Sequence, residues 1–474
     1  MNMAKLMNVD VAIIGAGTGG MYALREIRRR NKSFVLIDSG PLGTTCARVG
    51  CMPSKVALHI AEFWHSQKEF PRYGISGAEH LRLDGAAAWQ ALREQRDQFA
   101  NSAAGNAKKG AGEHLMMGRA RFLEPTLLEA EQTSGTQQVR AKAVIIANGS
   151  RPVMPAFLKP FSEHCITTDE FFEMENLPKS IGILGLGAIG LEMGLALARL
   201  GVEVHGADMA HTVAGISDPE VSEVALAEFA KEIHLYLGAP AELASAEQGV
   251  LLKAGDKQVQ VDKVLVALGR RPNTDQLNLA EAGFELDERG QPLFDVNTLQ
   301  VGSHPVFIVG DVNGYRPLMH EAADEGAMAG YNAVQPEPVA FKRKTPLAIA
   351  FTNPDVISVG KRFDELNESE VLIGTASSQA NGRSRVLTDR EGVLRLYADK
   401  NSGKLLGASM IGVRGEHVAQ LLALAIERGE TAHSLLQLAF YHPVVEEIIQ
   451  SALQDIAKHI PDAAGLPFGL ALAE

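Results

Sequence analysis

The chain has 474 residues and a formal net charge of −12, from 45 Lys and Arg against 57 Asp and Glu. This length predicts about three domains, and a composition with 46 % hydrophobic and 22 % charged residues excludes a largely disordered or fibrous chain. The acidity argues against a nucleic-acid partner, three cysteines are too few for a disulfide-stapled secreted scaffold, and no apolar run is long enough to span a membrane. We therefore expect a soluble cytoplasmic protein.

A short apolar segment near the start, residues 9–14, predicts a buried parallel strand. It leads into the pattern G-x-G-x-x-G and a helical segment, the order found in dinucleotide-binding units. Gly15 would permit the tight turn, Gly17 would let the backbone approach a pyrophosphate at the helix N-terminus, and Gly20 would let helix and strand pack closely. Asp38 follows the next strand, at the spacing expected of the acid that binds the ribose hydroxyls.

The same pattern returns in the middle of the chain with Gly185, Gly187 and Gly190, followed by Asp208 after the next strand. One match would be weak evidence, but two matches with the same offsets predict two dinucleotide sites. An acid at Asp208 repels a 2′-phosphate and residues 209–213 supply no arginine, which favours NAD over NADP at the second site. A chain that binds two dinucleotides can pass a hydride between them, so FAD is the expected ligand of the first.

Two of the three cysteines, Cys46 and Cys51, lie close together in a segment expected to be helical. A straight helix would hold them too far apart for a disulfide, but Gly50 and Pro53 would loosen the helix and let the sulfurs meet. In a cytosolic setting such a disulfide is usually catalytic. The alternatives are a zinc site, for which no second pair of ligands is evident, and two unrelated buried thiols. No metal site is predicted.

Residues 46–55, Cys-Ala-Arg-Val-Gly-Cys-Met-Pro-Ser-Lys, with a dinucleotide pattern on either side, resemble the flavin-dependent pyridine nucleotide–disulfide oxidoreductases. Residues 143–152, 264–273 and 306–311 resemble further segments of this family, so the resemblance covers nearly the whole chain. It implies an α/β fold with two Rossmann-like dinucleotide-binding domains and an α+β C-terminal dimerisation domain. The implied divisions are an FAD-binding segment at 1–150, an NAD-binding domain at 151–272, a central domain at 273–342 that completes the FAD site, and an interface domain at 343–474.

The resemblance also implies that FAD and NAD are the cofactors, and it assigns residues to them. Those expected at the flavin nucleotide are Gly15, Gly17, Gly20, Asp38, Lys55, Ala120, Gly149, Asp311 and Met319. Those expected towards the pyridine nucleotide are Gly185, Gly187, Gly190, Asp208 and Gly269, and Glu192 is a further expected cofactor-site residue. Lys55 and Glu192 are expected to pair beside the flavin, because a buried lysine needs a negative partner.

Beyond an interdomain connection at residues 335–346, two apolar segments around the turn 401–403 predict an antiparallel hairpin, and two amphipathic helices follow. Pro443 suits the first position of the second helix, which would place His442 at its cap. Residues 442–447 resemble the active-site base of the family and its orienting acid, at His442 and Glu447, with Glu446 as the alternative acid. In the family this pair comes from the partner subunit, which implies an obligate homodimer.

The implied reaction is the oxidation of dihydrolipoamide to lipoamide with reduction of NAD⁺. The base would generate a substrate thiolate that attacks the disulfide at Cys46, while Cys51 would face the flavin. No lipoyl carrier domain precedes Met1, so we expect any carrier to be a separate protein, such as one of a 2-oxoacid dehydrogenase complex.

Two positions depart from the dihydrolipoamide-oxidising members of the family. Arg48 stands where an Asn is usual, and Phe440 stands where another His is usual. These changes leave open an NAD(P)H-dependent reductase of another small, glutathione-like disulfide. A third hypothesis is a non-catalytic flavoprotein that binds both nucleotides, but the presence of both cysteines and His442 counts against it. We expect Cys165 to be structural.

Overall fold

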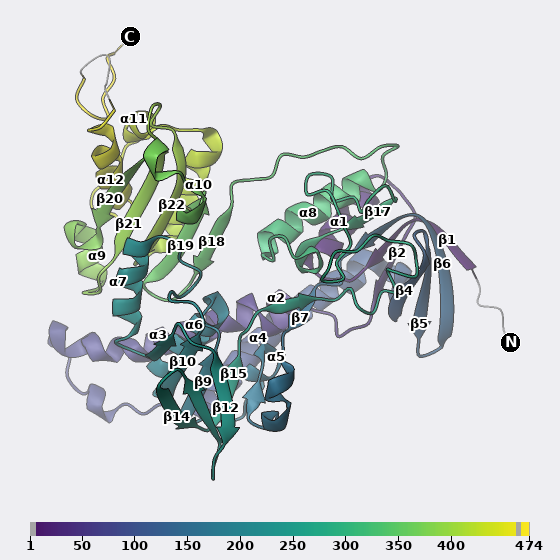
Figure 1. Cartoon of the computed structure of the whole chain (residues 1–474), viewed down its shortest axis with the longest axis horizontal. Helices are drawn as coiled ribbons and strands as arrows, with labels where there is room; N and C mark the ends of the chain where they lie inside the picture. Colours follow the sequence, from purple (N-terminus) through teal and green to yellow (C-terminus); the bar gives the residue numbers. More distant parts are fainter. Residues whose placement is uncertain (1–5, 461–465, 474) are drawn as a thin grey trace.

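The computed structural model describes residues 6–460 and 466–473. It contains one part built on a mixed sheet with parallel central strands, a second part built on a parallel sheet, and a C-terminal part with an antiparallel sheet (Figure 1). The first part lies at the right of the figure, the second at the bottom and the C-terminal part at the upper left. No helix within the described ranges is long and apolar enough to cross a lipid bilayer. The predicted α/β class with two Rossmann-like units is confirmed.

The first part is built on a seven-stranded sheet. Its strands are β1 (Leu6–Ile14), β2 (Phe34–Asp38), β3 (Leu115–Met117), β4 (Arg119–Glu124), β5 (Leu127–Gln132), β6 (Gly135–Ile146) and β17 (Val306–Ile308). Strands β2, β1, β6 and β17 run parallel, and Ile13, Leu36 and Ile145 on them are fully buried, which explains their continuous apolar sequences. Because β17 returns to this sheet after the whole second part, the second part is an insertion within the first.

The helices of the first part are α1 (Thr18–Arg29), α2 (Thr45–Val49), α3 (Cys51–His65), α4 (Gly85–Ala111) and α8 (Met319–Asn332). Helices α1 and α8 pack unusually closely. A Cβ atom at Gly326 or Gly330 of α8 would lie only 2.2 or 2.6 Å from a backbone oxygen of α1, so glycine is required at both positions. This packing holds the glycine-rich turn before α1 against the segment that leads into α8.

The second part has a five-stranded parallel sheet in the order β11-β10-β9-β15-β8, flanked by helices and by a three-stranded antiparallel sheet. The parallel strands are β8 (Cys165–Ile166), β9 (Ser180–Leu184), β10 (Glu203–Asp208), β11 (His234–Leu237) and β15 (Lys263–Val266). The helices are α5 (Thr168–Phe171), α6 (Ala188–Arg199) and α7 (Pro219–Phe229), and the antiparallel strands are β12 (Ala241–Ser245), β13 (Val250–Ala254) and β14 (Lys257–Val261). A two-stranded link of β7 (Ser150–Pro152) and β16 (Arg270–Pro272) connects this part to the first.

A buried charge network ties the second part to the C-terminal part. The Arg199 guanidinium, at the end of α6, donates two hydrogen bonds of 2.9 Å to the Glu232 carboxylate. It also donates 2.8 Å bonds to the backbone oxygens of Thr352 and Asn353 in the C-terminal part. The Arg199 side chain is only 2 % exposed, so these bonds are shielded from water.

We expect Arg199→Met to destabilise the protein by about 3 kcal/mol, because it leaves two buried carbonyl groups without their partner and removes one of the two guanidinium groups, those of Arg199 and Arg390, that pair with the Glu232 carboxylate. The midpoint of urea unfolding measures the effect. Lys142→Met is the matched control, because the Lys142 ammonium pairs with Asp10 at 2.8 Å but is 82 % exposed, and its loss should cost about 1 kcal/mol or less. Equal shifts in the two variants would contradict the expectation.

The C-terminal part is a five-stranded antiparallel sheet covered by helices. The strands are β18 (Leu347–Ala350), β19 (Asp355–Gly360), β20 (Val371–Ser377), β21 (Val393–Asp399) and β22 (Leu405–Gly412), and the helices are α9 (Gly382–Leu387), α10 (Gly415–Arg428), α11 (Ala432–Leu436) and α12 (Glu447–Ala457). The predicted hairpin is β21 and β22, and the predicted connection is the extended segment between α8 and β18, visible at the top of Figure 1. Both predictions are confirmed.

The predicted start of the last helix is wrong. Helix α12 begins at Glu447, and Pro443 lies in the non-helical segment before it. The Glu447 carboxylate accepts a hydrogen bond of 3.0 Å from the backbone N–H of Val444, which folds this segment back over the first turn of the helix. Because of this turn, His442 does not occupy a helix cap; it lies several residues ahead of the helix.

Candidate active site

The two glycine-rich turns have the same local geometry. In each, the last glycine touches the first: a Cβ atom at Gly20 would lie 1.9 Å from the oxygen of Gly15, and one at Gly190 would lie 1.9 Å from the oxygen of Gly185. The middle glycine has free space in both turns, since a Cβ at Gly187 would meet no atom within 4 Å and one at Gly17 would be in ordinary contact, 3.9 Å, with the backbone oxygen of Ala147. The outer glycines are therefore needed for packing, whereas the middle one leaves room for a ligand at the helix N-terminus.

The acids predicted to bind ribose accept hydrogen bonds from the backbone of these turns. The Asp38 carboxylate accepts a 2.7 Å hydrogen bond from the backbone N–H of Ala16, and the Asp208 carboxylate accepts a 2.6 Å bond from that of Leu186. The two parallel units thus place their acids at equivalent points, at the ends of β2 and β10. Gly269 lies between β15 and β16, at the same edge of the second sheet.

Replacing the middle and the last glycine of the second turn should have different consequences. Gly187→Ala should fold normally but weaken binding of the pyridine nucleotide by roughly 10–100-fold, because the new methyl group crowds the approach of the pyrophosphate. Gly190→Ala should destabilise the second part, because its methyl group collides with the backbone of Gly185. Nucleotide titration and thermal melting separate the two effects, and equal loss of melting temperature in both would contradict this assignment.

Two adjoining cavities of about 400 and 460 Å³ extend from the first turn. The first is lined by predicted residues Gly15, Gly17, Asp38, Ala120 and Gly149. The second is lined by the predicted residues Cys46, Cys51, Lys55, Asp311, Met319 and Glu192. The two share Gly17, Thr44 and Gly149, so together they form one elongated space that crosses the open middle glycine. This shape and the open turn fit an extended dinucleotide such as FAD, whereas Gly20 contributes packing behind the turn.

The Asp311 carboxylate is held at the edge of the second cavity. It accepts a 2.8 Å hydrogen bond from the Ser150 hydroxyl, on β7. Beside it, the buried Glu325 carboxylate accepts a 2.7 Å bond from the backbone N–H of Gly310 and a 2.6 Å bond from Arg343. Sequence reasoning missed Glu325 and Arg343. Glu325 lies within a helix and Arg343 in the connection that follows it, and no sequence motif indicates that the two side chains pair.

The predicted pair of Lys55 and Glu192 is confirmed. The Lys55 ammonium, on α3, lies 2.7 Å from the Glu192 carboxylate, on α6. The ammonium also lies 4.5 Å from the centre of the Phe351 ring, and the backbone N–H of Phe351 donates a 2.9 Å bond to Glu192. The ion pair at the border of the second cavity therefore joins the first part to the second part. Phe351 of the C-terminal part contacts both members of this pair.

The two cysteines lie on either side of a break in the helix. Helix α2 ends at Val49 and α3 begins at Cys51, with Gly50 between them. A Cβ atom at Gly50 would lie 3.2 Å from the Cα of Cys46, so a side chain there would push the two segments apart. The expected loosening of the helix at Gly50 is confirmed, and both Cys46 and Cys51 line the second cavity.

Both groups are free thiols in the structure. The hydrogen bond from the Cys46 thiol lowers the pKa of Cys51 to about 7, and the Lys55 ammonium contributes to this shift. The same hydrogen bond and burial raise the pKa of Cys46. As the pH rises, the pair therefore loses its first proton from Cys51 near neutrality, and the proton of Cys46 stays in place.

The source of this low pKa can be tested with two substitutions at one position. Cys46→Ser keeps a hydrogen-bond donor and should leave the pKa of Cys51 near neutrality. Cys46→Ala removes the donor and should move the pKa of Cys51 up towards the ordinary thiol range of about 8.5. Thiolate absorbance of the protein across a pH titration measures the change. Identical titrations of the two variants would show that the hydrogen bond is not the cause.

His442 and Glu447 form the predicted pair, since the His442 Nδ1 atom lies 2.9 Å from the Glu447 carboxylate. This hydrogen bond lowers the pKa of Glu447. The alternative acid, Glu446, is instead the residue that immediately precedes α12. The His442 side chain is 78 % exposed and does not line the cysteine cavity in the described chain. The structure thus joins the imidazole to its acid, but it does not bring the imidazole to the cysteines of the same chain.

The remaining singled-out residues have ordinary environments. Arg48 is half-buried on α2, and Phe440 is half-buried and packs against the core of the C-terminal part. Cys165 is buried on β8, where burial raises the pKa of its thiol.

Comparisons with known proteins agree with this arrangement. The family model "Pyridine nucleotide-disulphide oxidoreductase" matches residues 9–326, and the model of the dimerisation domain of that family matches residues 347–453. The chain is 27 % identical to the dihydrolipoyl dehydrogenase of Bacillus subtilis (strain 168), over 94 % of this chain and 96 % of the relative. It is 31 % identical to the dihydrolipoyl dehydrogenase of Thermus scotoductus, over 95 % of this chain and 97 % of the relative.

Two solved structures share the fold. The HOCl-induced flavoprotein disulfide reductase RclA from Escherichia coli, in its Cu(II) complex, has a TM-score of 0.83 at 22 % identity, over 94 % of this chain and 99 % of that chain. LpdA from Mycobacterium tuberculosis has a TM-score of 0.83 at 21 % identity, with the same coverage. Because the two family models cover the described parts in chain order, the protein belongs to the pyridine nucleotide-disulphide oxidoreductases.

Proposed function

We propose that this protein oxidises dihydrolipoamide to lipoamide and reduces NAD⁺, through the Cys46–Cys51 pair. The observation that carries the proposal is the pair of free thiols, Cys46 and Cys51, in the cavity that Lys55 and Glu192 border. Members of the family bind FAD and a pyridine nucleotide. When bound, FAD supplies two-electron chemistry, accepting electrons from the dithiol and passing a hydride to NAD⁺.

The chain's own residues account for the thiol half of the reaction. The His442 imidazole, oriented by Glu447, takes a proton from one substrate thiol. The resulting thiolate attacks the sulfur of Cys46, and the Cys46–Cys51 disulfide breaks with Cys51 leaving as a thiolate. A leaving thiol with a pKa near 7 speeds this step. The second substrate thiol then closes the lipoamide disulfide and releases Cys46, which receives the second proton.

We propose a homodimer in which His442 of the partner subunit completes each active site. The match to the dimerisation-domain model supports the dimer. The exposure of the imidazole, away from the cysteine cavity of its own chain, supports its use by a neighbouring chain. The lipoamide group would be presented by a separate carrier protein.

NAD is the proposed pyridine nucleotide. The Asp208 carboxylate lies at the end of β10, where the ribose of a nucleotide on the second turn would lie. A 2′-phosphate there would meet this negative charge, and residues 209–213 contain no arginine to offset it.

A second candidate is an NAD(P)H-dependent reductase of another small disulfide. Two observations favour it: Phe440 takes a packing role where the lipoamide-oxidising relatives have a second histidine, and Arg48 adds a half-buried positive charge two residues after Cys46. A glutathione-like disulfide carries carboxylates that such a charge would attract.

The two candidates differ in substrate and in direction. Purified holoenzyme is given dihydrolipoamide with NAD⁺ or NADP⁺, and formation of the reduced nucleotide is followed. In parallel, it is given NADH or NADPH with glutathione disulfide. Rapid NADH formation from dihydrolipoamide, with little from NADP⁺, is the expected result. No turnover of dihydrolipoamide, together with rapid oxidation of NADPH by glutathione disulfide, would establish the second candidate instead. Inactivity with every disulfide would favour a non-catalytic flavoprotein.

A further inference from the structure

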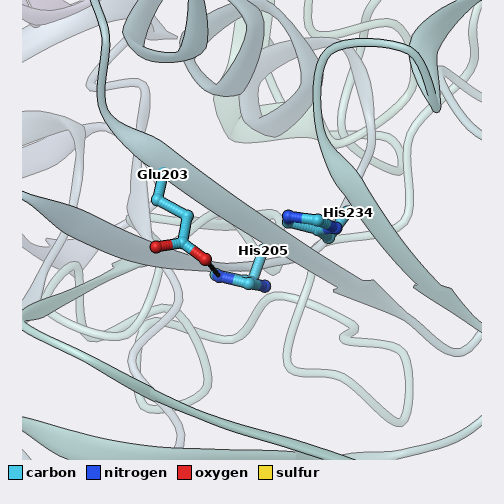
Figure 2. A group of neighbouring side chains, drawn as sticks. All are labelled: Glu203, His205 and His234. Atoms are coloured by element: carbon cyan, nitrogen blue, oxygen red, sulfur yellow. Dashed lines mark hydrogen bonds and ion pairs between the residues drawn. The ribbon is translucent and has the colours of Figure 1, made fainter.

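A cluster of three potential metal ligands lies in the second part, at the strands farthest from the link to the first part. Glu203 and His205 are on β10, and His234 is on the edge strand β11. Their ligand atoms all lie within 4.8 Å of one another. Figure 2 shows the Glu203 carboxylate directed at the His205 ring, with the His234 ring beside it on the next strand.

The sheet register explains why these side chains meet. His205 and His234 are direct partners in the parallel pairing of β10 with β11, so their side chains leave the same face. Glu203 precedes His205 by two residues on its strand and therefore shares that face. The two imidazole rings are stacked, with centres 4.6 Å apart and planes inclined by 13°. Two strands thus deliver three ligands to one point.

The His205 ring is already oriented as a metal ligand. Its Nδ1 atom lies 3.0 Å from the Tyr236 hydroxyl, which can accept a hydrogen bond from this nitrogen. Its Nε2 atom lies 3.1 Å from the Glu203 carboxylate. Histidines that bind metals usually donate their second ring N–H to such an outer partner, which leaves the other nitrogen for the ion. The His205 side chain is 4 % exposed, so the surroundings hold this ring in place.

We propose that Glu203, His205 and His234 bind a divalent transition-metal ion of the Zn²⁺ class, with water as a fourth ligand. Two imidazoles and one carboxylate are a donor set that suits Zn²⁺. Bonds of about 2.0–2.1 Å place neighbouring ligand atoms of a tetrahedral site about 3.3 Å apart. The Glu203–His205 distance is already close to that value. His234 closes the site by rotating out of the ring stack, and its exposed side chain on the edge strand leaves room for this movement.

The ion would act as a clamp between β10 and the edge strand, and not as part of catalysis. Glu203 begins β10, and Asp208, the residue expected at the nucleotide, ends it. The cluster therefore lies towards the opposite end of the strand from the nucleotide turn. We expect Zn²⁺ to raise the melting temperature of the protein.

Calorimetric titration with Zn²⁺ tests the site. The FAD-loaded protein carries Cys46→Ser and Cys51→Ser in every sample, so that the thiol pair cannot bind the ion. One Zn²⁺ per chain is expected. Tyr236→Phe removes an outer partner of the ligand His205 and should weaken Zn²⁺ binding by roughly 10–100-fold. His234→Ala removes a ligand itself and should weaken the binding by more than that. Both altered side chains lie near the surface of the sheet, and circular dichroism checks that the variants fold.

His80→Ala is the matched control. His80 lies 3.4 Å from the carboxylate of Glu79, so it is also an exposed histidine beside a glutamate, but it is not part of a three-ligand group in the described chain. Zn²⁺ affinity should be unchanged in this variant, and the rise in melting temperature should be kept. Equal Zn²⁺ affinity in the His234→Ala variant and its parent, or no binding of Zn²⁺ by the parent, would overturn the proposal.

Discussion

Replacement of Cys51 by serine is expected to leave FAD bound and to lower turnover by about 10⁴-fold or more, the scale seen when a covalent nucleophile is removed. The reason is that a serine hydroxyl cannot form the disulfide that accepts the electrons of the substrate dithiol. The cavity should keep its shape, because serine differs from cysteine by a single atom. Flavin absorbance of the purified variant measures the bound cofactor, and NADH formation from dihydrolipoamide measures turnover.

Cys165→Ser is the matched control for this substitution. Cys165 is buried on β8, outside the cavity that contains the other two cysteines, so turnover should be retained. Substantial activity in the Cys51→Ser variant would refute the dithiol mechanism. Loss of flavin from that variant would instead assign Cys51 to cofactor binding.

Replacement of His442 by glutamine is expected to lower turnover by about 10²–10⁴-fold, because the substrate thiol then loses its general base. The deficit should shrink as the pH rises, since a free thiol with a pKa of about 8.5 ionises without help. Glu447→Gln keeps the imidazole and should cause a smaller loss, because Glu447 only orients the ring and stabilises its charged form. The pH dependence of kcat/KM for both variants measures these effects.

His417→Gln is the control, because His417 lies 3.6 Å from the carboxylate of Glu416 and its side chain is 61 % exposed. This His–Glu pair should be dispensable for turnover. A deficit in His442→Gln that stays constant at every pH would contradict the role of a base, because a purely structural loss has no reason to follow the ionisation of the substrate.

The glycine-rich turns could be predicted because their requirements are local. A Cβ at Gly20 or Gly190 collides with the backbone five residues earlier in the same turn, so the sequence spacing reports the geometry directly. The break at Gly50 between the two cysteines was predictable for the same reason. The pairing of Lys55 with Glu192 is not local, and it could be expected only from the resemblance to the family.

Other features depend on contacts that no local pattern reports. Helix α12 starts at Glu447 because its carboxylate binds the backbone of Val444, a contact that overrides the preference of Pro443 for a helix start. Glu325 and Arg343 meet only when α8 and the following connection pack together. His205 and His234 meet through the register of two strands separated by helix α7 in the sequence.

The account requires that one active site contains the cysteine pair of one chain and His442 of the partner subunit. A dimer with Cys51→Ser in one chain and His442→Gln in the other tests this requirement, once it is isolated by two different affinity tags. One of its two sites then has an intact cysteine pair and an intact base, so about half of the wild-type turnover is expected. Turnover no higher than in the two parent variants would contradict the account.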